Sequence, residues 1–310
     1  MKKQITYLAI ALLSTGLFFT SCKKEKATDD TTTEVKVLAD DQERFSNEND
    51  AATSDANAAL ENLGGSYVGD TPLTPQLPFA CDATVSVDTA STPRKITITY
   101  NGSNCLGNRT RTGSIIISFA PNFRWVTAGS FYTVTMVNFK ITRVSDGKSI
   151  VFNGEKKITN VSGGKLRNLA TRTTPIVHEI TSAGMTVTFD NGTQRSWQIA
   201  KRRTYTYDNG IVFAVTGIAA QGGGIAEWGI NRSNYSFTNA ILEPMTVKQS
   251  CNFRLVSGKA QHISNGRTVT ATYGLDAAGV PVTSCPTGPF YYKVVWTNAA
   301  GLSYTVIAPY

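Results

Sequence analysis

The sequence predicts an all-β protein: a long antiparallel β-meander that forms a large curved sheet or a sandwich, with one short N-terminal helix. Threonines alternate with apolar or aromatic residues over residues 96–100, 185–189 and 269–273, which is the period of a half-buried strand. Only residues 40–64 have a helical pattern. Successive strands without helices between them pair as antiparallel hairpins.

Turn signals separate these strand-like runs. Asn-Gly pairs begin at residues 101, 153, 191, 209 and 265, and Asp146-Gly147 adds a sixth signal. Such pairs fit tight hairpin turns, because asparagine and glycine tolerate the positive φ angles that these turns need. The six pairs therefore predict a series of hairpins along the chain.

The first 21 residues follow the pattern of an export signal. Lys2 and Lys3 supply the positive charge, and residues 5–19 are almost wholly apolar. As a helix this apolar stretch would reach about 22 Å, which is short of the ~30 Å hydrocarbon core of a bilayer. We therefore expect residues 1–21 to be a signal peptide rather than a membrane-spanning helix.

Residues 19–22, Phe-Thr-Ser-Cys, place small residues before a cysteine. This resembles the lipobox of bacterial lipoproteins, in the relaxed form common in Bacteroidota. The resemblance implies cleavage before Cys22 and acylation of Cys22, and each buried CH₂ of an acyl chain contributes about 0.8 kcal/mol to anchoring. The alternative is an ordinary cleavage site beside a chance cysteine. Lys23 stands where an aspartate favours retention in the inner membrane, so we expect the outer membrane, facing either the periplasm or the medium.

Two segments precede the β-domain. Residues 22–39 are rich in Lys, Glu, Asp and Thr, which is typical of a flexible acidic tether. Residues 40–64 contain many alanines with a thin apolar stripe, and Gly64-Gly65 is a good stop signal. We expect a short helix there that lies on the body of the protein.

Residues 65–310 form the predicted β-domain. Residues 95–100 and 267–273 share the same alternation and end in tyrosine. The domain is therefore either one unit or two related halves, at about residues 65–165 and 175–310.

Four cysteines remain once Cys22 is assigned to lipidation, and an even number in an exported protein indicates disulfides. Cys81 and Cys105 flank two strand-like runs on either side of a turn at residues 90–93, so a hairpin would bring them together. Cys251 and Cys285 flank the hairpin signal at Asn265-Gly266. We predict the pairs 81–105 and 251–285; the alternative is free, buried cysteines.

Beyond the lipobox and the acidic tether, a wider resemblance covers most of the chain. Residues 95–102 after Cys81, residues 109–113 and residues 154–160 resemble uncharacterised β-rich outer-envelope lipoproteins of Bacteroidota. The resemblance implies the compartment and the fold class, and it brings no functional residues with it.

Charge is unevenly distributed. Residues 22–63 carry five basic and eleven acidic residues, whereas the chain from Gly64 onward carries 23 basic and 11 acidic ones. A basic body attracts anionic glycans or lipids, unless the acidic leader folds back on it. Our candidate for an anionic-ligand patch is the run of cations that leads into two tyrosines: Lys201, Arg202, Arg203, Tyr205 and Tyr207. The alternative is that these aromatics are core and the cations protect a strand edge.

Catalytic signals are weak. His178 and His262 are the only histidines, so a three-histidine zinc site cannot form, and His178-Glu179 lacks the second histidine of a zinc-protease motif. The sequence has no Cys-x-x-Cys pair and no Gly-x-Ser-x-Gly elbow. Residues 222–224, Gly-Gly-Gly, lack the Lys-Ser/Thr of a phosphate loop and predict a bulge or turn. We expect no catalytic residue, no metal and no cofactor.

These observations favour a non-catalytic, lipid-anchored envelope protein, a binding or scaffolding β-module at the outer membrane. Its expected partners are the membrane and an anionic glycan, a lipid or another envelope protein, but not nucleic acid. One alternative is a carrier that holds a lipid or amphiphile in a cavity of the curved sheet. The other is an enzyme for envelope glycans, which needs two convergent carboxylates.

Overall fold

The computed structural model describes residues 41, 44–60, 81–297 and 301–310. Arg44–Tyr310 form one compact unit. The predicted signal peptide, Cys22 and the tether of residues 22–39 lie outside the described residues. Within the described part of the chain, no helix is both long and apolar enough to cross a membrane.

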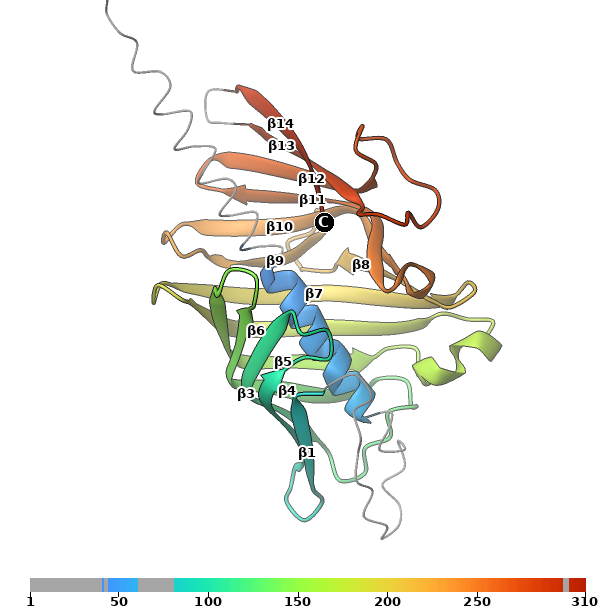
Figure 1. The fold of residues 1–310 in the computed structure, drawn as a ribbon. Helices are drawn as coiled ribbons and strands as arrows, with labels where there is room; N and C mark the ends of the chain where they lie inside the picture. The colour runs from blue at the N-terminus through green and yellow to red at the C-terminus, as the bar shows by residue number, and fades with distance from the viewer. Residues whose placement is uncertain (1–40, 42–43, 61–80, 298–300) are drawn as a thin grey trace, which may run out of the picture. The chain divides into compact units, whose positions relative to one another are not determined.

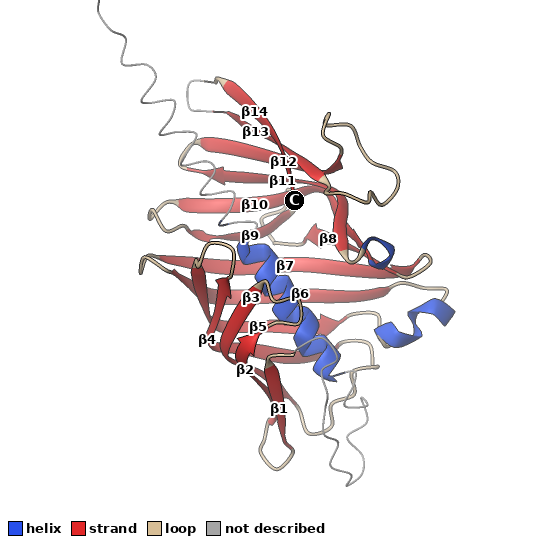
Figure 2. Cartoon of the chain, viewed as in Figure 1, coloured by secondary structure: helices blue, strands red, loops and turns tan. Residues whose placement is uncertain are grey.

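Within the described residues, fourteen strands form one antiparallel sheet (Figures 1 and 2). They are β1 (Ala83–Asp88), β2 (Arg94–Ser103), β3 (Arg109–Phe119), β4 (Ser130–Arg143), β5 (Ser149–Asn160), β6 (Ile176–Phe189), β7 (Gln194–Tyr207), β8 (Ile211–Gly217), β9 (Ile225–Ile230), β10 (Ser236–Lys248), β11 (Arg254–Ser264), β12 (Arg267–Leu275), β13 (Tyr291–Thr297) and β14 (Ser303–Pro309). Two 3₁₀ turns, η1 (Leu166–Thr171) and η2 (Gln249–Cys251), interrupt the series. The predicted all-β meander is confirmed, as the large sheet rather than the sandwich.

The strand order follows the chain, with one exception. β8 and β9 share a single position between β7 and β10: β9 pairs with one end of each neighbour and β8 with the other. The segment 218–224 separates the two short strands. Because β5 and β6 also pair directly, the sheet continues across the predicted boundary near residues 165–175, and the division into two related halves stays a prediction.

Irregular pairing crosses the middle strands and accounts for the curvature of the sheet, since each bulge bends its strand. The register shifts between Thr112 and Ser114 in β3 and between Met136 and Phe139 in β4. Gly113 is needed at this crossing, because its φ is +90° and a Cβ there would lie 2.1 Å from the carbonyl oxygen of Asn138. Further shifts follow in β5 and β6.

Four of the six predicted turns are confirmed, namely those at Asp146-Gly147, Asn191-Gly192, Asn209-Gly210 and Asn265-Gly266. The turns predicted at Asn101-Gly102 and Asn153-Gly154 are wrong, because both pairs lie inside strands. Gly154 serves close packing instead: a Cβ there would lie 2.8 Å from the Cα of Met185 on the neighbouring strand.

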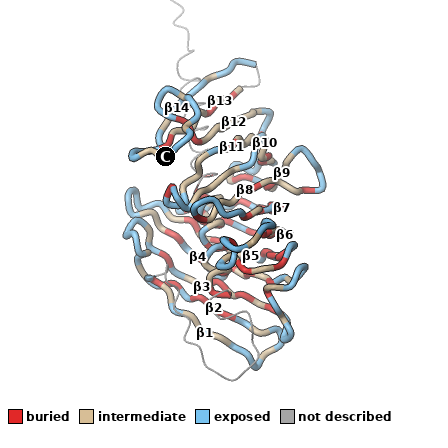
Figure 3. Tube along the Cα trace, turned by 90° about the vertical axis from the view of Figure 1, so that its right-hand side faces the viewer, coloured by how far each residue is buried: buried red, intermediate tan, exposed pale blue. Residues whose placement is uncertain are grey.

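A helix over residues 44–60 lies across one face of the sheet (Figure 1). We call this side the helix face and the opposite side the far face. Alternate residues of the strands point to the helix face, where they form the core with Phe45, Ala52, Ala56, Ala59 and Leu60 of the helix. Figure 3 shows the resulting alternation of buried and exposed residues along β2–β7. The predicted N-terminal helix is therefore confirmed.

Both predicted disulfides are present. Cys81 bonds to Cys105 beside the β1–β2 hairpin, and Cys251 bonds to Cys285 beside β11 and β12. Their Cα–Cα separations are 5.1 and 5.3 Å, within the usual range for a disulfide. The β1–β2 hairpin, in which Ala83 lies opposite Tyr100, brings together the two chain segments that carry Cys81 and Cys105.

Candidate functional site

The predicted anionic-ligand patch on β7 does not form, so this prediction is wrong. Lys201, Arg203 and Tyr205 point to the helix face and are 3%, 2% and 7% exposed. Arg202 points to the far face and pairs with Glu179 at 2.6 Å. Tyr207, at the end of the strand, is 52% exposed. The prediction failed because neighbouring residues of a strand point to opposite faces, so a run of cations cannot make one surface.

Acidic side chains of the helix pair with basic residues on the helix face of the sheet. Three strand arginines each contact a helix carboxylate: Arg109 with Glu48 at 2.6 Å, Arg111 with Asp55 at 2.9 Å and Arg203 with Asp50 at 2.7 Å. Burial alone would raise the pKa of Asp50, but Arg203, Lys201 and Lys156 outweigh it and hold this pKa below its ordinary value. In residues 44–60, the acidic leader thus folds back on the basic body.

A chain of buried and partly buried polar groups runs from this helix to β11. The Nζ of Lys201 lies 2.5 Å from the Oε1 of Glu227 and donates to the Oγ of Ser46 at 3.1 Å. The other carboxylate oxygen of Glu227 accepts a bond from Asn239, whose Oδ1 lies 2.7 Å from the Nδ1 of His262. This arrangement contains a Ser–Lys pair and a carboxylate. An adjacent base can activate a serine as a nucleophile, so Lys201 would have to act as that base for Ser46.

Lys201 cannot act as the base of that pair. Burial alone would lower its pKa, but the charges of Glu227 and Asp50 outweigh burial and raise it. A lysine that stays protonated cannot accept the proton of Ser46, so the hydroxyl is not activated as a nucleophile. The chain of groups stabilises the contact between helix and sheet instead.

Lys156 is buried beneath the same helix. Its Nζ donates to the carbonyl oxygen and the Oδ1 of Asn49, at 3.1 and 2.6 Å, and to the Oγ1 of Thr53 at 2.6 Å. Burial lowers its pKa well below the ordinary value. All three acceptors belong to the helix, so the amine is satisfied only while the helix is docked.

The two histidines are structural. His178 packs between Trp125 and Tyr205, and burial lowers its pKa to about 3. Burial likewise lowers the pKa of His262 to about 4. Among the described residues, no group of three His, Cys, Asp or Glu side chains is arranged to hold a metal ion.

These histidines predict acid sensitivity. An unfolded histidine titrates near pH 6.5, so between about pH 4 and 6.5 the unfolded chain binds protons that the folded protein excludes. The contribution of these histidines to the free energy of unfolding is therefore fully present above the unfolded pKa, and it decreases as pH falls through this window. From pH 7.5 to 5 we expect a loss of about 2 kcal/mol for each histidine.

Urea unfolding at the two pH values measures this loss. His178→Phe keeps the ring packing and removes the proton site, and His262→Gln keeps a partner for Asn239. The double variant should lose about 4 kcal/mol less than the parent between these pH values. An unchanged pH dependence in the double variant would show that the histidines are not responsible.

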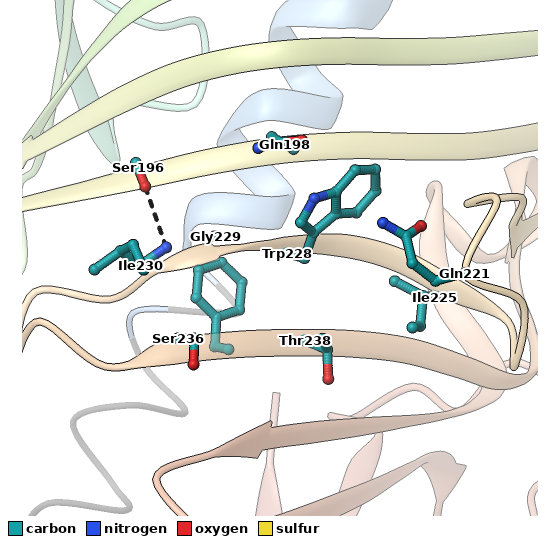
Figure 4. A pocket seen from close by; sticks show the side chains of 10 residues that line it. Ser196, Gln198, Gln221, Ile225, Trp228, Gly229, Ile230, Ser236 and Thr238 are labelled. Atoms are coloured by element: carbon teal, nitrogen blue, oxygen red, sulfur yellow. Dashed lines mark hydrogen bonds between the residues drawn. The ribbon is translucent and has the colours of Figure 1, made fainter.

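The far face carries a groove of about 350 Å³ over β7, β9 and β10 (Figure 4). Its centre is Trp228 on β9, which is partly exposed. Two residues further on, Ile230 points the same way and is 40% exposed. Glu227, the residue before Trp228, points to the helix face and is 1% exposed. Because side chains alternate along β9, Trp228 and Ile230 therefore lie on the far face.

Polar side chains flank this apolar ridge on both sides. In the strand register, Trp228 lies between Gln198 and Thr238, and Ile230 lies between Ser196 and Ser236. Residues directly opposite each other in antiparallel strands have Cβ atoms about 4.5–5.5 Å apart. The sheet therefore builds two rows, each with an apolar residue at its centre and an amide or hydroxyl at each end.

A glycine turn closes a third side. Gly222, Gly223 and Gly224 have φ angles of +77°, +60° and +70°, which only glycine adopts readily, and this confirms the predicted turn. The turn carries Gln221 to a position beside Trp228 (Figure 4). It exists because β8 and β9 share one place in the sheet.

The groove has unused hydrogen-bonding capacity. The Oγ of Ser196 accepts the backbone N–H of Ile230 at 3.1 Å. The side chains of Gln198, Gln221 and Thr238 have no hydrogen-bond partner within the part of the chain that the structure describes. None of the ten residues that line the groove carries a charge, so the groove suits a neutral ligand with hydroxyl or amide groups.

A second hollow, of about 820 Å³, lies beside the loop of residues 120–129. Phe119, Phe123 and Phe131 line it, and Phe131 is 50% exposed with the Nζ of Lys157 4.0 Å from its ring centre. This hollow is larger and more aromatic than the groove at Trp228.

Comparison with known proteins adds no assignment. The chain matches no protein-family model, no curated protein and no solved structure.

The four tryptophans could stack on a sugar ring if exposed, but no local signal in the sequence distinguishes Trp228 from the other three. The alternation of β7 makes Ser196 and Gln198 point away from the buried Trp197, and that much is readable from the sequence. The positions of Trp228, Thr238 and Gln221 next to them depend on strand register and on a shared sheet position, for which the sequence carries no local signal.

Proposed function

We propose that this chain is a lipid-anchored, non-catalytic protein of the bacterial outer membrane whose β-domain is a binding module. The export pattern of residues 1–21 and the lipobox ending at Cys22 support the anchor. The observation that carries the binding function is the groove at Trp228, where a partly exposed indole lies among Gln198, Gln221 and Thr238, whose side chains have no hydrogen-bond partner among the described residues.

The helix face supports the non-catalytic part of the proposal. Lys201 and Glu227 are buried in an ion pair beside the helix, and Asn239 joins Glu227 to the partly buried His262. They face away from the groove, because Trp228 and Glu227 are adjacent on one strand and point to opposite faces.

A carrier of an apolar ligand is the second candidate, and the hollow at Phe131 favours it. Its three phenylalanines offer apolar surface, and its volume lies within the range of about 300–1,000 Å³ that is common for ligand pockets. This hollow would hold a lipid or amphiphile rather than a polar ligand.

Two experiments test the proposal. Cys22→Ala should abolish incorporation of radiolabelled palmitate and move the protein from the membrane fraction to the periplasm or medium; continued labelling would contradict the anchor. Native mass spectrometry of residues 23–310, exported so that the disulfides form, should show additional mass after incubation with envelope extract. Added glycan or protein mass supports the binding module, added lipid mass supports the carrier, and an unchanged mass with every fraction contradicts both.

A further inference from the structure

We infer that the groove at Trp228 is a binding site for a neutral glycan, in which a sugar ring stacks on the indole of Trp228. This inference rests on the proposed binding function and specifies its ligand class.

The shape of the two rows matches the chemistry of a sugar ring. A pyranose has an apolar face of C–H groups and a rim of hydroxyls. Trp228 and Ile230 supply an apolar ridge for the face, and Gln198, Ser196, Thr238 and Ser236 lie on either side of it. A side-chain amide both donates and accepts hydrogen bonds, as a sugar hydroxyl does.

The residues that line the groove indicate that its ligand is uncharged. A carboxylated or sulfated glycan needs a cation in its site, and the residues that line this groove carry none. Three basic residues of β7, Arg195, Lys201 and Arg203, are buried on the helix face. Arg202 does point to the far face, but it pairs with Glu179.

The size of the groove fits one or two units of a glycan. The groove volume of about 350 Å³ lies at the lower end of the range for ligand sites. Side chains two residues apart on a strand are separated by roughly 6.6 Å, so Trp228 and Ile230 form a platform for one or two sugar units.

The test uses the full exported chain purified in mild detergent. Affinities are measured by isothermal titration for cellotetraose, laminaritetraose and maltotetraose, and for an anionic tetramer of galacturonate. We expect at least one neutral tetramer to bind and the galacturonate tetramer not to bind. Trp228→Ala should weaken binding by at least about tenfold, Trp228→Phe should retain part of it, and Gln198→Ala or Gln221→Ala should cost about fivefold.

Phe131→Ala is the matched control, since it removes an exposed aromatic from the second hollow and should leave affinity unchanged. Unchanged melting temperatures exclude misfolding of the variants. Glycan binding that survives Trp228→Ala would overturn this site while leaving the binding module intact. If no neutral tetramer binds but native mass spectrometry finds another ligand, the ligand class is wrong and the proposed function stands. If neither binds, both fail.

Discussion

Replacing Arg111 with methionine is expected to destabilise the protein by about 3–5 kcal/mol, because it removes the cation that pairs with the buried carboxylate of Asp82 and the partly buried one of Asp55. The guanidinium donates to both oxygens of Asp82, at 2.7 and 2.5 Å, and to Asp55 of the helix at 2.9 Å. The side chain of Asp82 is fully buried and that of Asp55 is 15% exposed. Arg111 also lies over the ring of Tyr100, 4.4 Å from its centre.

The matched control is Arg202→Met. Arg202 also pairs with one carboxylate, that of Glu179, but the two side chains are 47% and 28% exposed. Solvent screens such a pair, so its loss should change stability by no more than about 1 kcal/mol. Urea unfolding at pH 7.5 measures both variants. Equal, small losses would mean that the buried arginine does not stabilise the contact between helix and sheet.

Phe45→Ala should cost about 3–5 kcal/mol and loosen the helix over residues 44–60. Phe45 is 1% exposed and packs against Trp197 and Phe152 of the sheet. Arg195 lies over its ring, 4.4 Å from the centre. The truncation removes the largest apolar side chain that the helix contributes to the core, and it leaves a cavity next to a buried cation.

Unfolding in urea and hydrogen exchange measure the two effects of this change. The backbone amides of residues 44–60 should exchange faster in Phe45→Ala, while those of β3–β5 keep their protection. Asn47→Ala alters an exposed residue of the same helix, and it should shift stability by less than about 0.5 kcal/mol. Helix amides that remain as protected as in the parent protein would contradict the role given to Phe45.

The fold was largely predictable because the signals for strands are local. The alternation at Ile96, Ile98 and Tyr100 depends only on which face of a strand is buried, and these residues are 0%, 0% and 1% exposed. The pairing of Cys81 with Cys105 was predictable because the turn signal at residues 90–93 lies midway between the two cysteines. The glycines within strands were not predictable, because Gly102 and Gly154 follow an asparagine just as the turn glycines do.

The site was less predictable, because it depends on contacts distant in the sequence. The cations of β7 formed a promising surface cluster in the sequence, yet Lys201 and Arg203 are covered by a helix about 150 residues earlier in the chain. Lys156 is buried for the same reason. Conversely, the sequence offers four tryptophans that could stack on a sugar ring, and only the structure distinguishes Trp228, which is partly exposed and has Gln198 and Thr238 beside it in the register.

Titrating the ¹⁵N-labelled protein with a neutral tetrasaccharide, while following its tryptophan indole N–H signals, tests whether the far face binds sugar. The chain has four tryptophans; Trp125, Trp197 and Trp296 are 0%, 0% and 6% exposed, whereas Trp228 lies in the groove. The signal that disappears in Trp228→Phe should shift with added sugar, and the other three should stay in place. A Trp228 signal that does not move at saturating sugar, or shifts confined to the buried tryptophans, would contradict binding at this groove.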